Sequence, residues 1–320
     1  MRVTLPGRAY LADLERFLRL VTDDGSRDLT FELRDGLFSV HPLVLCMIAA
    51  MGETARESGG VVRLENEVTN ASSRYLQRMG LFSLLDVEVD ISVQEHESAG
   101  RFVPLRRIQS NQQLNDFILD VGPLLHASPE ETKSVKYVLF ELIRNVLEHS
   151  GAPGGAYVCA QVAQKSGRLL LGVADAGRGI KSTMQVSHPV RDDKAAVSLA
   201  FQPGVTGTTP NFGGNETNGG AGLFFMKSMA ILARHHMVVV TGDVLMKLLT
   251  DPKRSVHPKL EQDRVKWWTL PVAFSGTSVG IDLTVDDLLG FEELFSDIKA
   301  AYGLNVSQSR KARYKARFSR

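Results

Sequence analysis

Stretches with the two-residue period of β-strands alternate along this chain with stretches of helical period, and this alternation constrains the fold more than any other feature. Strands are predicted at 28–33, which alternates clearly, and at 61–64 and 87–93. Helices are predicted at 10–20, which has helical spacing, and at 42–56 and 69–79. Pro42 favours the start of a helix, and Gly80 favours the end of one. Such an order predicts a small α/β domain with a parallel or mixed sheet.

The same alternation resumes after a polar segment that Gly100 and Pro104 interrupt. Helices are predicted at 111–125, 129–149 and 221–233, and strands at 156–163, 168–174, 237–241 and 278–284. We therefore divide the 320 residues into an α/β domain at 1–95, a linker at 96–108, a second α/β domain at 109–290, and a C-terminal helix with a basic tail at 291–320.

Bulk properties exclude several classes of protein. Hydrophobic residues make up 43% of the chain, and a formal net charge of +1 gives no electrostatic reason to expect nucleic acid or anionic membrane, except through the basic tail. Cys46 and Cys159 both lie in apolar stretches, which suits a reducing compartment. The longest apolar run, near 41–52, is far shorter than the roughly 18–20 residues of a membrane helix. We expect a cytoplasmic protein without a membrane partner.

Polar residues that carry chemistry first appear on the helix predicted at 129–149. This helix is apolar on most of its circumference, yet Glu141, Arg144, Asn145 and Glu148 share one stripe at spacings of three and four. Buried carboxylate and carboxamide groups are unfavourable unless they are paired, so a ligand site is one interpretation. The alternative is an amphipathic helix whose polar stripe faces water.

Two glycine-containing motifs follow on the chain. DAGRGI, which begins at Asp175, comes directly after a predicted strand, and its glycines let a flat ligand approach the backbone closely. NGGAGLFFMK, at 218–227, opens a helix, and a helix start of this kind can bind phosphate. Taken singly, each is as compatible with a plain turn or a helix cap.

Together, in this order and spacing, the three motifs resemble the Bergerat ATP-binding fold of gyrase B subunits, heat-shock chaperone ATPases, histidine kinases, MutL proteins and anti-sigma serine kinases. The resemblance covers roughly 111–285 and implies a two-layer α/β sandwich that binds ATP and Mg²⁺. It implies that Asn145 holds the metal, that Glu141 acts as the general base, and that Glu148 supports the site.

The resemblance also assigns the nucleotide contacts. Asp175 is expected to accept a hydrogen bond from the adenine amino group, and Thr277 to contact adenine from a late strand. Four glycines are expected to pass close to the nucleotide or its phosphates: Gly177, Gly179, Gly220 and Gly222. The segment at 181–218 corresponds to an ATP lid.

The sequence departs from the family pattern at two places, and these indicate which branch it resembles. Histidine kinases carry a helical hairpin with a phospho-acceptor histidine before the ATP-binding domain. Here the preceding helix has only His126, which lies at its end without an acidic neighbour, and this disfavours a histidine kinase. The segment ELIRNVLEHS is similar instead to the corresponding segment of the anti-sigma serine kinases. Residues 243–268 form a charged insertion with no family role, which we interpret as an interaction loop or hairpin whose Trp267–Trp268 pair is packed.

The first domain resembles the STAS fold of anti-sigma antagonists in its order of elements and in the text GLFSVHPLVLCMIAAM. Val40 and His41 stand where that family carries a phosphorylated serine, with Ser39 just before them. We therefore interpret this domain as a docking module without an acceptor. An unrelated small α/β domain is the alternative.

The leading functional interpretation is a slow ATPase that acts as a nucleotide-gated switch and is read by a protein partner, of STAS type or another regulatory kind. Two alternatives stay open: a protein serine/threonine kinase of the anti-sigma type, and an ATP-sensing scaffold without turnover. Glu141 disfavours the scaffold, because activation of water needs a base near the γ-phosphate. A homodimer is compatible with the resemblance.

Overall fold

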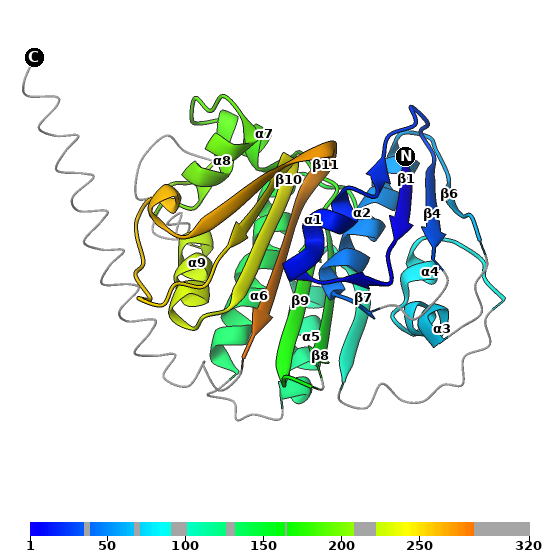
Figure 1. The fold of residues 1–320 in the computed structure, drawn as a ribbon, viewed down its shortest axis with the longest axis horizontal. Helices are drawn as coiled ribbons and strands as arrows, with labels where there is room; N and C mark the ends of the chain where they lie inside the picture. Colours follow the sequence, from blue (N-terminus) through cyan, green and yellow to red (C-terminus); the bar gives the residue numbers. More distant parts are fainter. Residues whose placement is uncertain are drawn as a thin grey trace, which may run out of the picture.

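The computed structural model describes residues 1–34, 39–66, 71–90, 101–125, 132–163, 165–207 and 222–284, which form a mixed α/β protein (Figure 1). Its N-terminal part contains β1 (Arg2–Leu5), β2 (Arg8–Ala9), η1 (Leu11–Asp13), α1 (Leu14–Leu18), β3 (Val21–Thr22), β4 (Leu29–Leu33), β5 (Ser39–Val40), α2 (Pro42–Glu57), β6 (Val62–Leu64), α3 (Ala71–Arg78) and α4 (Leu81–Leu84). The helices predicted at 42–56 and 69–79 are confirmed as α2 and α3.

The rest of the described chain contains β7 (Phe102–Ile108), α5 (Asn111–Val121), η2 (Gly122–Leu125), α6 (Lys133–Asn145), η3 (Val146–Ser150), β8 (Ala156–Ala163), β9 (Arg168–Ala174), α7 (Gly179–Gln185), α8 (Asp193–Ala200), α9 (Gly222–Leu232), β10 (His236–Leu248), η4 (Leu260–Gln262) and β11 (Val265–Leu283). The predicted C-terminal helix and basic tail at 291–320 lie outside the described residues.

Two main sheets organise these elements. The smaller has the order β3-β1-β4-β6, in which β3 is antiparallel and the other pairs are parallel, so the mixed sheet predicted here is confirmed. The larger has the order β10-β11-β9-β8-β7 and is antiparallel throughout. Strands β2 and β5 form a short separate pair.

Helix α2 lies between the two sheets (Figure 1). Its sequence PLVLCMIAAMG is apolar on all sides, and a helix of this kind is stable only when it is buried all round. It approaches the large sheet at Gly172 of β9, where a Cβ atom would overlap the backbone of Leu43. Gly280, the β11 partner of Gly172, likewise leaves room for the Leu43 side chain.

The hydrophobic interior has two main parts, one on each face of the large sheet. Helices α5, α6 and α9 cover one face. The other face packs against α2 and the small sheet in a single cluster that includes Phe31, Ile48, Tyr157 and Val240. The described residues up to 90 therefore share their core with the second half of the chain.

The structure corrects two predictions in the boundary region. Residues 102–108, assigned to the linker, form the edge strand β7, whose Val103, Leu105 and Ile108 are buried. Pro104 misled the assignment, since an edge strand tolerates proline and the register of β7 shifts just after it. The strand predicted at 87–93 is not found in its described part, residues 87–90, and the remainder lies outside the described residues.

The predicted insertion at 243–268 contains the extended ends of β10 and β11, which form a hairpin, and the connecting segment that carries η4. Trp267 and Trp268 are half-buried and pack on opposite faces of this hairpin, so the prediction that they are packed is confirmed. Gly242 and Gly276, both with positive φ, lie where the register between the two strands shifts. The hairpin therefore bends away from the sheet at these glycines.

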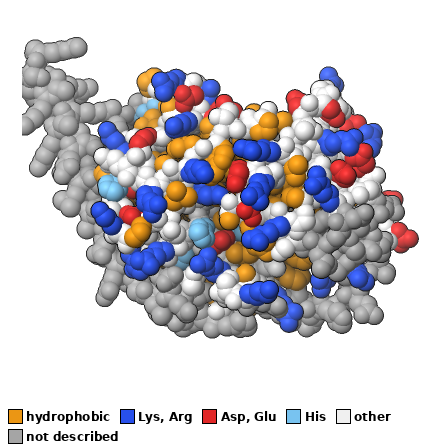
Figure 2. All heavy atoms as spheres, in the orientation of Figure 1, with side chains coloured by type: hydrophobic (Ala, Val, Ile, Leu, Met, Phe, Trp, Pro, Cys, Tyr) orange, Lys and Arg blue, Asp and Glu red, His pale blue; other side chains and the backbone are white. Residues whose placement is uncertain are grey.

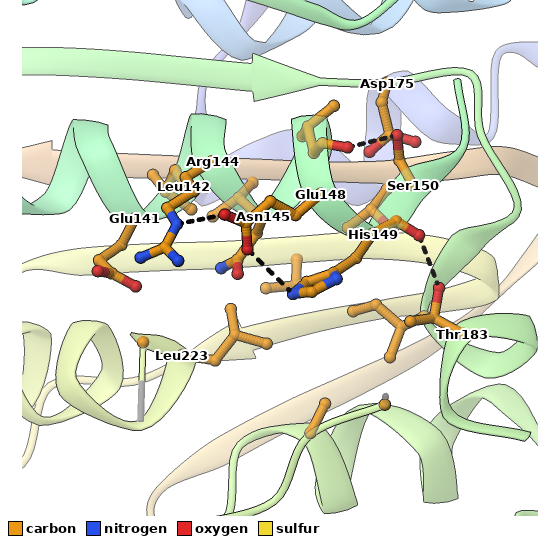
Figure 3. Close-up of a pocket in the computed structure, with 18 of the residues that line it drawn as sticks. Glu141, Leu142, Arg144, Asn145, Glu148, His149, Ser150, Asp175, Thr183 and Leu223 are labelled. Carbon is orange, nitrogen blue, oxygen red and sulfur yellow. Dashed lines mark hydrogen bonds and ion pairs between the residues drawn. The ribbon is translucent and has the colours of Figure 1, made fainter. Parts of the chain in front are cut away.

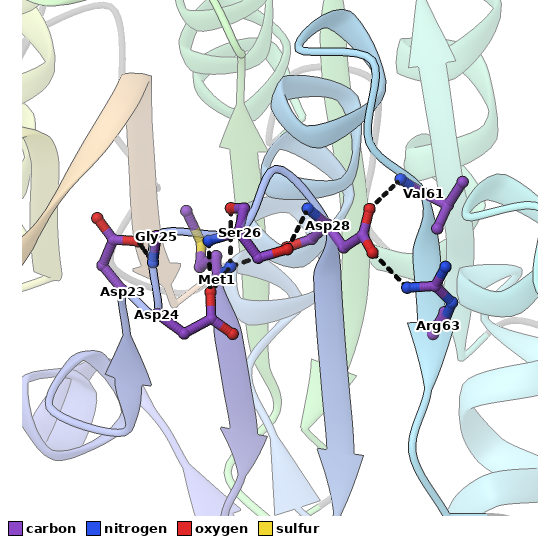
Figure 4. Close-up of polar contacts among 8 residues, drawn as sticks. All are labelled: Met1, Asp23, Asp24, Gly25, Ser26, Asp28, Val61 and Arg63. Atoms are coloured by element: carbon purple, nitrogen blue, oxygen red, sulfur yellow. Dashed lines mark hydrogen bonds and ion pairs between the residues drawn. The ribbon is translucent and has the colours of Figure 1, made fainter.

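The first residues of β1 are fixed by polar contacts at one end of the small sheet (Figure 4). The amino group of Met1 donates to Asp24 Oδ1 at 2.7 Å and to the carbonyl oxygen of Asp28 at 2.8 Å. The Asp28 carboxylate in turn accepts from the backbone of Val61 and from Arg63. These contacts connect the starts of β1, β4 and β6.

The face that carries α1 and the hairpin shows basic side chains interleaved with acidic and hydrophobic ones rather than a patch of one sign (Figure 2). Lys247 of β10, for example, binds the Ala12 carbonyl oxygen and lies 3.5 Å from Glu15 Oε2. Among the described residues, no helix has the length and apolar character needed to cross a membrane.

Candidate functional site

A cavity of about 240 Å³ lies between α6, η3, the large sheet, α7 and the start of α9. Three segments that are far apart in the sequence meet there: the end of α6 with η3, the turn after β9, and the first residues of α9. The polar lining is drawn in Figure 3, in which Glu141 and Asp175 lie at opposite ends. The predicted site residues that line the cavity are Glu141, Asn145, Glu148, Asp175, Gly179, Gly222 and Thr277.

The polar stripe of α6 faces this cavity rather than only water. Glu141 and Asn145 lie on α6, and the helix then widens into the π-helix η3, which carries Glu148 and His149. The hydroxyl of Ser150 donates to the Val146 carbonyl oxygen at 2.7 Å, and Gly151 ends the turn with φ of 65°. Such π-turns within helices often occur at functional sites, where they redirect side chains.

Asp175 provides a buried carboxylate at one end of the cavity. Its Oδ1 accepts from the Gly177 backbone at 2.8 Å, and the backbone of Thr277 is a second donor. Burial raises the pKa of Asp175 to about 7, because the two hydrogen bonds only partly offset the loss of hydration and the negative charge of Glu53 adds to the effect. A carboxylate has about four acceptor sites, so Asp175 can also bind a donor on a ligand.

Glycines around Asp175 permit this geometry. A Cβ atom on Gly177 would overlap the Ser150 carbonyl oxygen, and one on Gly276 would overlap the Asp175 backbone. Gly179, with φ of 73°, begins α7 at the edge of the cavity. Gly177 is therefore close to the site but supports the turn from behind instead of lining the cavity.

Glu141 and Asn145 lie at the other end, beside Gly222. A Cβ atom on Gly222 would overlap Glu141 Oε2 and would lie 3.7 Å from Asn145 Nδ2. Burial raises the pKa of Glu141, the charge of Arg144 partly reverses this, and the charge of Glu148 adds to it. Gly220, which was predicted to contact phosphate, lies outside the described residues.

Arg144 and Glu148 form an ion pair along the helix, with Nε and Oε1 2.6 Å apart. Glu148 also lies 3.8 Å from His149 Nε2, and burial lowers the pKa of His149. Glu148 is thus engaged with its helix neighbours while it lines the cavity. In the described part of the predicted lid, Lys181, Arg191 and Lys194 do not line the cavity. Lys194 lies over the Trp267 ring at 5.5 Å, and Arg191 pairs with Asp192.

Sequence reasoning missed several residues that build the site. His149 and Thr183 line the cavity, and the Thr183 hydroxyl lies 3.4 Å from the His149 carbonyl oxygen. Thr241 of β10 accepts from the Ile180 backbone and donates to the Gly276 carbonyl oxygen at 2.8 Å, which joins α7 to the hairpin. His149 lies four residues after Asn145, and this spacing could have placed it on the polar stripe of α6. The sequence around Thr241 offers no comparable signal.

No protein-family model matches this chain, and no match is found among curated proteins.

Proposed function

We propose that the chain is a Mg²⁺-ATP-binding protein of the Bergerat type, with a small STAS-like domain before it, and that it acts as a slow ATPase whose nucleotide state a regulatory protein partner reads. The observation that carries this proposal is the meeting of the three motifs at one cavity. Their order along the cavity, with the Asp175 turn at one end and Glu141, Asn145 and Gly222 at the other, matches a nucleotide lying with its base and phosphates at opposite ends.

The chemistry of the Asp175 end suits adenine. An ionised carboxylate accepts hydrogen bonds only, and adenine presents an amino group where guanine presents a carbonyl oxygen. Asp175 is 1% exposed, so an unmatched ligand group beside it would lose hydration without a compensating hydrogen bond. Adenine nucleotides should therefore bind better than guanine nucleotides.

The opposite end suits phosphates and a hard cation. Asn145 and Glu141 offer oxygen ligands of the kind that Mg²⁺ prefers, and bound Mg²⁺ neutralises phosphate charge during transfer. The beginning of α9 at Gly222 offers the backbone amides of a first helical turn, which have no partner within the helix, as donors to a phosphate. The raised pKa of Glu141 moves this carboxylate towards the range in which it can accept a proton from water.

Titration calorimetry with ATP and GTP, each with and without Mg²⁺, tests the binding proposal. We expect Mg²⁺-dependent binding of ATP and at least a tenfold preference for it over GTP, about the effect of one mismatched hydrogen bond. Equal affinity for the two nucleotides contradicts the role of Asp175. Phosphate release, compared with transfer to a candidate STAS partner, separates an ATPase from a serine kinase.

A further inference from the structure

Glu53 of α2 is a buried carboxyl group that the proposed function does not use. Its side chain is 5% exposed, and it lies between the N-terminal part of the chain and the large sheet. The charge of Glu53 is felt by the Tyr157 hydroxyl, and its Oε2 has no hydrogen-bond partner. A buried carboxyl that is only half satisfied is unfavourable, so packing alone does not account for a glutamate here.

The Glu53 carboxyl group also packs against the loop at 151–155, which follows η3. A Cβ atom on Gly154 would overlap both of its oxygens, so only glycine permits this contact. From the other side, Arg107 Nε donates to the Gly154 carbonyl oxygen at 2.8 Å. The loop is thus held between α2 and the end of β7.

This loop leads directly to the Asp175 end of the cavity. The Ala152 backbone donates to the Ser150 hydroxyl at 3.0 Å, and the Ser150 carbonyl oxygen accepts from the Arg178 backbone at 2.9 Å. Gly177 packs on that same carbonyl group. The turn that carries Asp175 therefore rests on a loop whose position depends on Glu53.

Sheet register brings Glu53 close to Asp175 by a second route. Tyr157, which interacts electrostatically with Glu53, pairs with Ala174, the residue just before Asp175. Side chains alternate between the faces of a strand, so Glu53 lies behind the sheet at the point where Asp175 projects into the cavity. The two carboxyl groups interact electrostatically across it.

We infer that Glu53 is a positioning residue for Asp175: it holds the 151–155 loop and places a negative charge behind the base-binding end of the cavity. Through it, the N-terminal part of the chain sets the affinity and the pH dependence of nucleotide binding. The inference rests on the proposed function, because it assigns a support to the same pocket.

Other charged groups near these carboxyls must be considered for the pH dependence. Arg56 and Glu57 on α2 and Arg107 on β7 interact electrostatically with the Glu53–Tyr157 pair or its neighbours. On the cavity side, Glu148, His149 and Glu141 share the lining with Asp175. Burial lowers the pKa of His149 below its ordinary value, whereas it raises the pKa of Asp175 to about 7.

The test measures the affinity of the full chain for ATP and for adenosine between pH 5.5 and 8.5. Three variants are compared with the wild type: Glu53→Gln, Glu53→Ala and, as a matched control, Glu57→Gln, an exposed glutamate one turn later on α2. Circular dichroism melting defines a temperature at which each variant is fully folded. Glu53→Gln keeps the shape of the side chain and removes only its charge.

For Glu53→Gln we expect the midpoint of the pH dependence to move down by roughly half a unit or more, the effect of removing a nearby like charge. For Glu53→Ala we expect affinity for ATP and adenosine to fall by the same factor, roughly tenfold, as when other sites lose a supporting partner. Glu57→Gln should leave both ligands unaffected.

The outcomes separate this inference from the proposed function. If the wild type binds neither ATP nor adenosine, the proposed function fails and the inference fails with it. If the wild type binds both and the Glu53→Gln midpoint coincides with that of the wild type, the positioning role is wrong while the nucleotide pocket stands. A purely structural effect of Glu53 lowers affinity at every pH and leaves the midpoint in place, which also overturns the inference.

Discussion

The side chain of His41 connects the start of α2 to Asp282 near the end of β11. His41 Nδ1 accepts from the Leu43 backbone at 3.0 Å as the N-cap of α2, and Nε2 lies 2.9 Å from Asp282 Oδ1. The backbone hydrogen bond requires an unprotonated Nδ1, so Nε2 carries the proton that is donated to Asp282. His41 is fully buried, at the place where the STAS resemblance expects an accessible serine.

Replacing His41 by Ala removes both bonds and should lower the free energy of unfolding by about 2–4 kcal/mol, which combines a lost cap with a lost hydrogen bond to a charged group. Urea denaturation measures the change. Ser110→Ala, at the N-cap of α5, is the control for capping alone and should lower stability by only about 1 kcal/mol. Equal effects of the two substitutions contradict a stabilising bond between His41 and Asp282.

Asp175→Asn should stabilise the ligand-free protein while it weakens ATP binding. The pKa of Asp175 is about 7 in the folded state against 3.8 ordinarily, so the folded protein keeps a proton that the unfolded chain loses between these values. The stability from this group is complete below pH 4 and is lost as the pH rises through 7. At pH 8 the variant should gain at most about 4 kcal/mol, and at pH 5 much less.

Urea midpoints at the two pH values measure this difference, with exposed Asp116→Asn as the control. Asn can still accept from the Gly177 backbone, so loss of this hydrogen bond does not mask the gain. An Asp175→Asn variant that is less stable than the wild type at pH 8 contradicts the account of Asp175 as a destabilising group kept for binding.

The buried pair of Lys227 on α9 and Asp263 after η4 should show strong coupling. Their side chains are fully buried, Nζ lies 2.6 Å from Oδ2, and Lys227 also donates to the His257 carbonyl oxygen. Lys227→Met removes the buried cation from the Asp263 carboxylate, which then keeps only its contacts with His257, and should lower stability by about 3–5 kcal/mol. The double variant Lys227→Met/Asp263→Leu should recover most of this loss, and additive losses in denaturation would show that the pair is not coupled.

Much of the fold could be predicted because its signals are local. The N-caps and apolar residues of α2 and α5 and the apolar content of α9 favour helices, and the short apolar runs of β8 and β9 favour buried strands. The edge strand β7 could not be distinguished from a linker by sequence, because Pro104 and the two arginines that follow it are typical of a loop. Helix α2 is apolar on all sides and packs against both sheets. The division of the chain into two domains did not take this into account.

The site was predictable to the extent that it lies in contiguous motifs. Glu141, Asn145, Asp175 and Gly222 meet at one cavity, as the combination of motifs indicated. The π-turn of η3, which brings His149 to the lining, depends on backbone geometry that VLEHS does not encode in any recognisable pattern. Glu53 and Thr241 act from segments far away in the sequence, and only tertiary structure reveals such contacts.

Gly222→Ala should impair turnover more than stability. The added methyl group would overlap Glu141 Oε2, which lies at the end of a flexible side chain, so the carboxylate would move and the fold would remain. We expect phosphate release to slow by about 10²-fold or more, as for loss of a positioned base. Gly122→Ala, at a helical glycine with nothing within 4 Å of the new methyl group, is the control and should leave turnover unchanged.

The last prediction separates binding from turnover at the same end of the cavity. Asn145→Ala removes an oxygen ligand of the expected cation and should abolish the Mg²⁺-dependent part of ATP affinity. Glu141→Gln keeps the size and hydrogen bonds of the side chain but cannot accept a proton, so it should leave ATP affinity nearly intact and slow phosphate release by about 10²–10⁴-fold. Calorimetry and a phosphate-release assay measure the two quantities for both variants.

Asn115→Ala on the exposed face of α5 and Glu261→Gln on η4 serve as controls, since each makes the same chemical change away from the cavity. A serine kinase would show the same dependence on Glu141, but its phosphate transfer to a STAS partner would exceed hydrolysis. An ATP-sensing scaffold would show the loss of affinity for Asn145→Ala with no turnover in any variant. If Glu141→Gln releases phosphate as fast as the wild type, Glu141 is not the base, because no proton acceptor remains on that side chain.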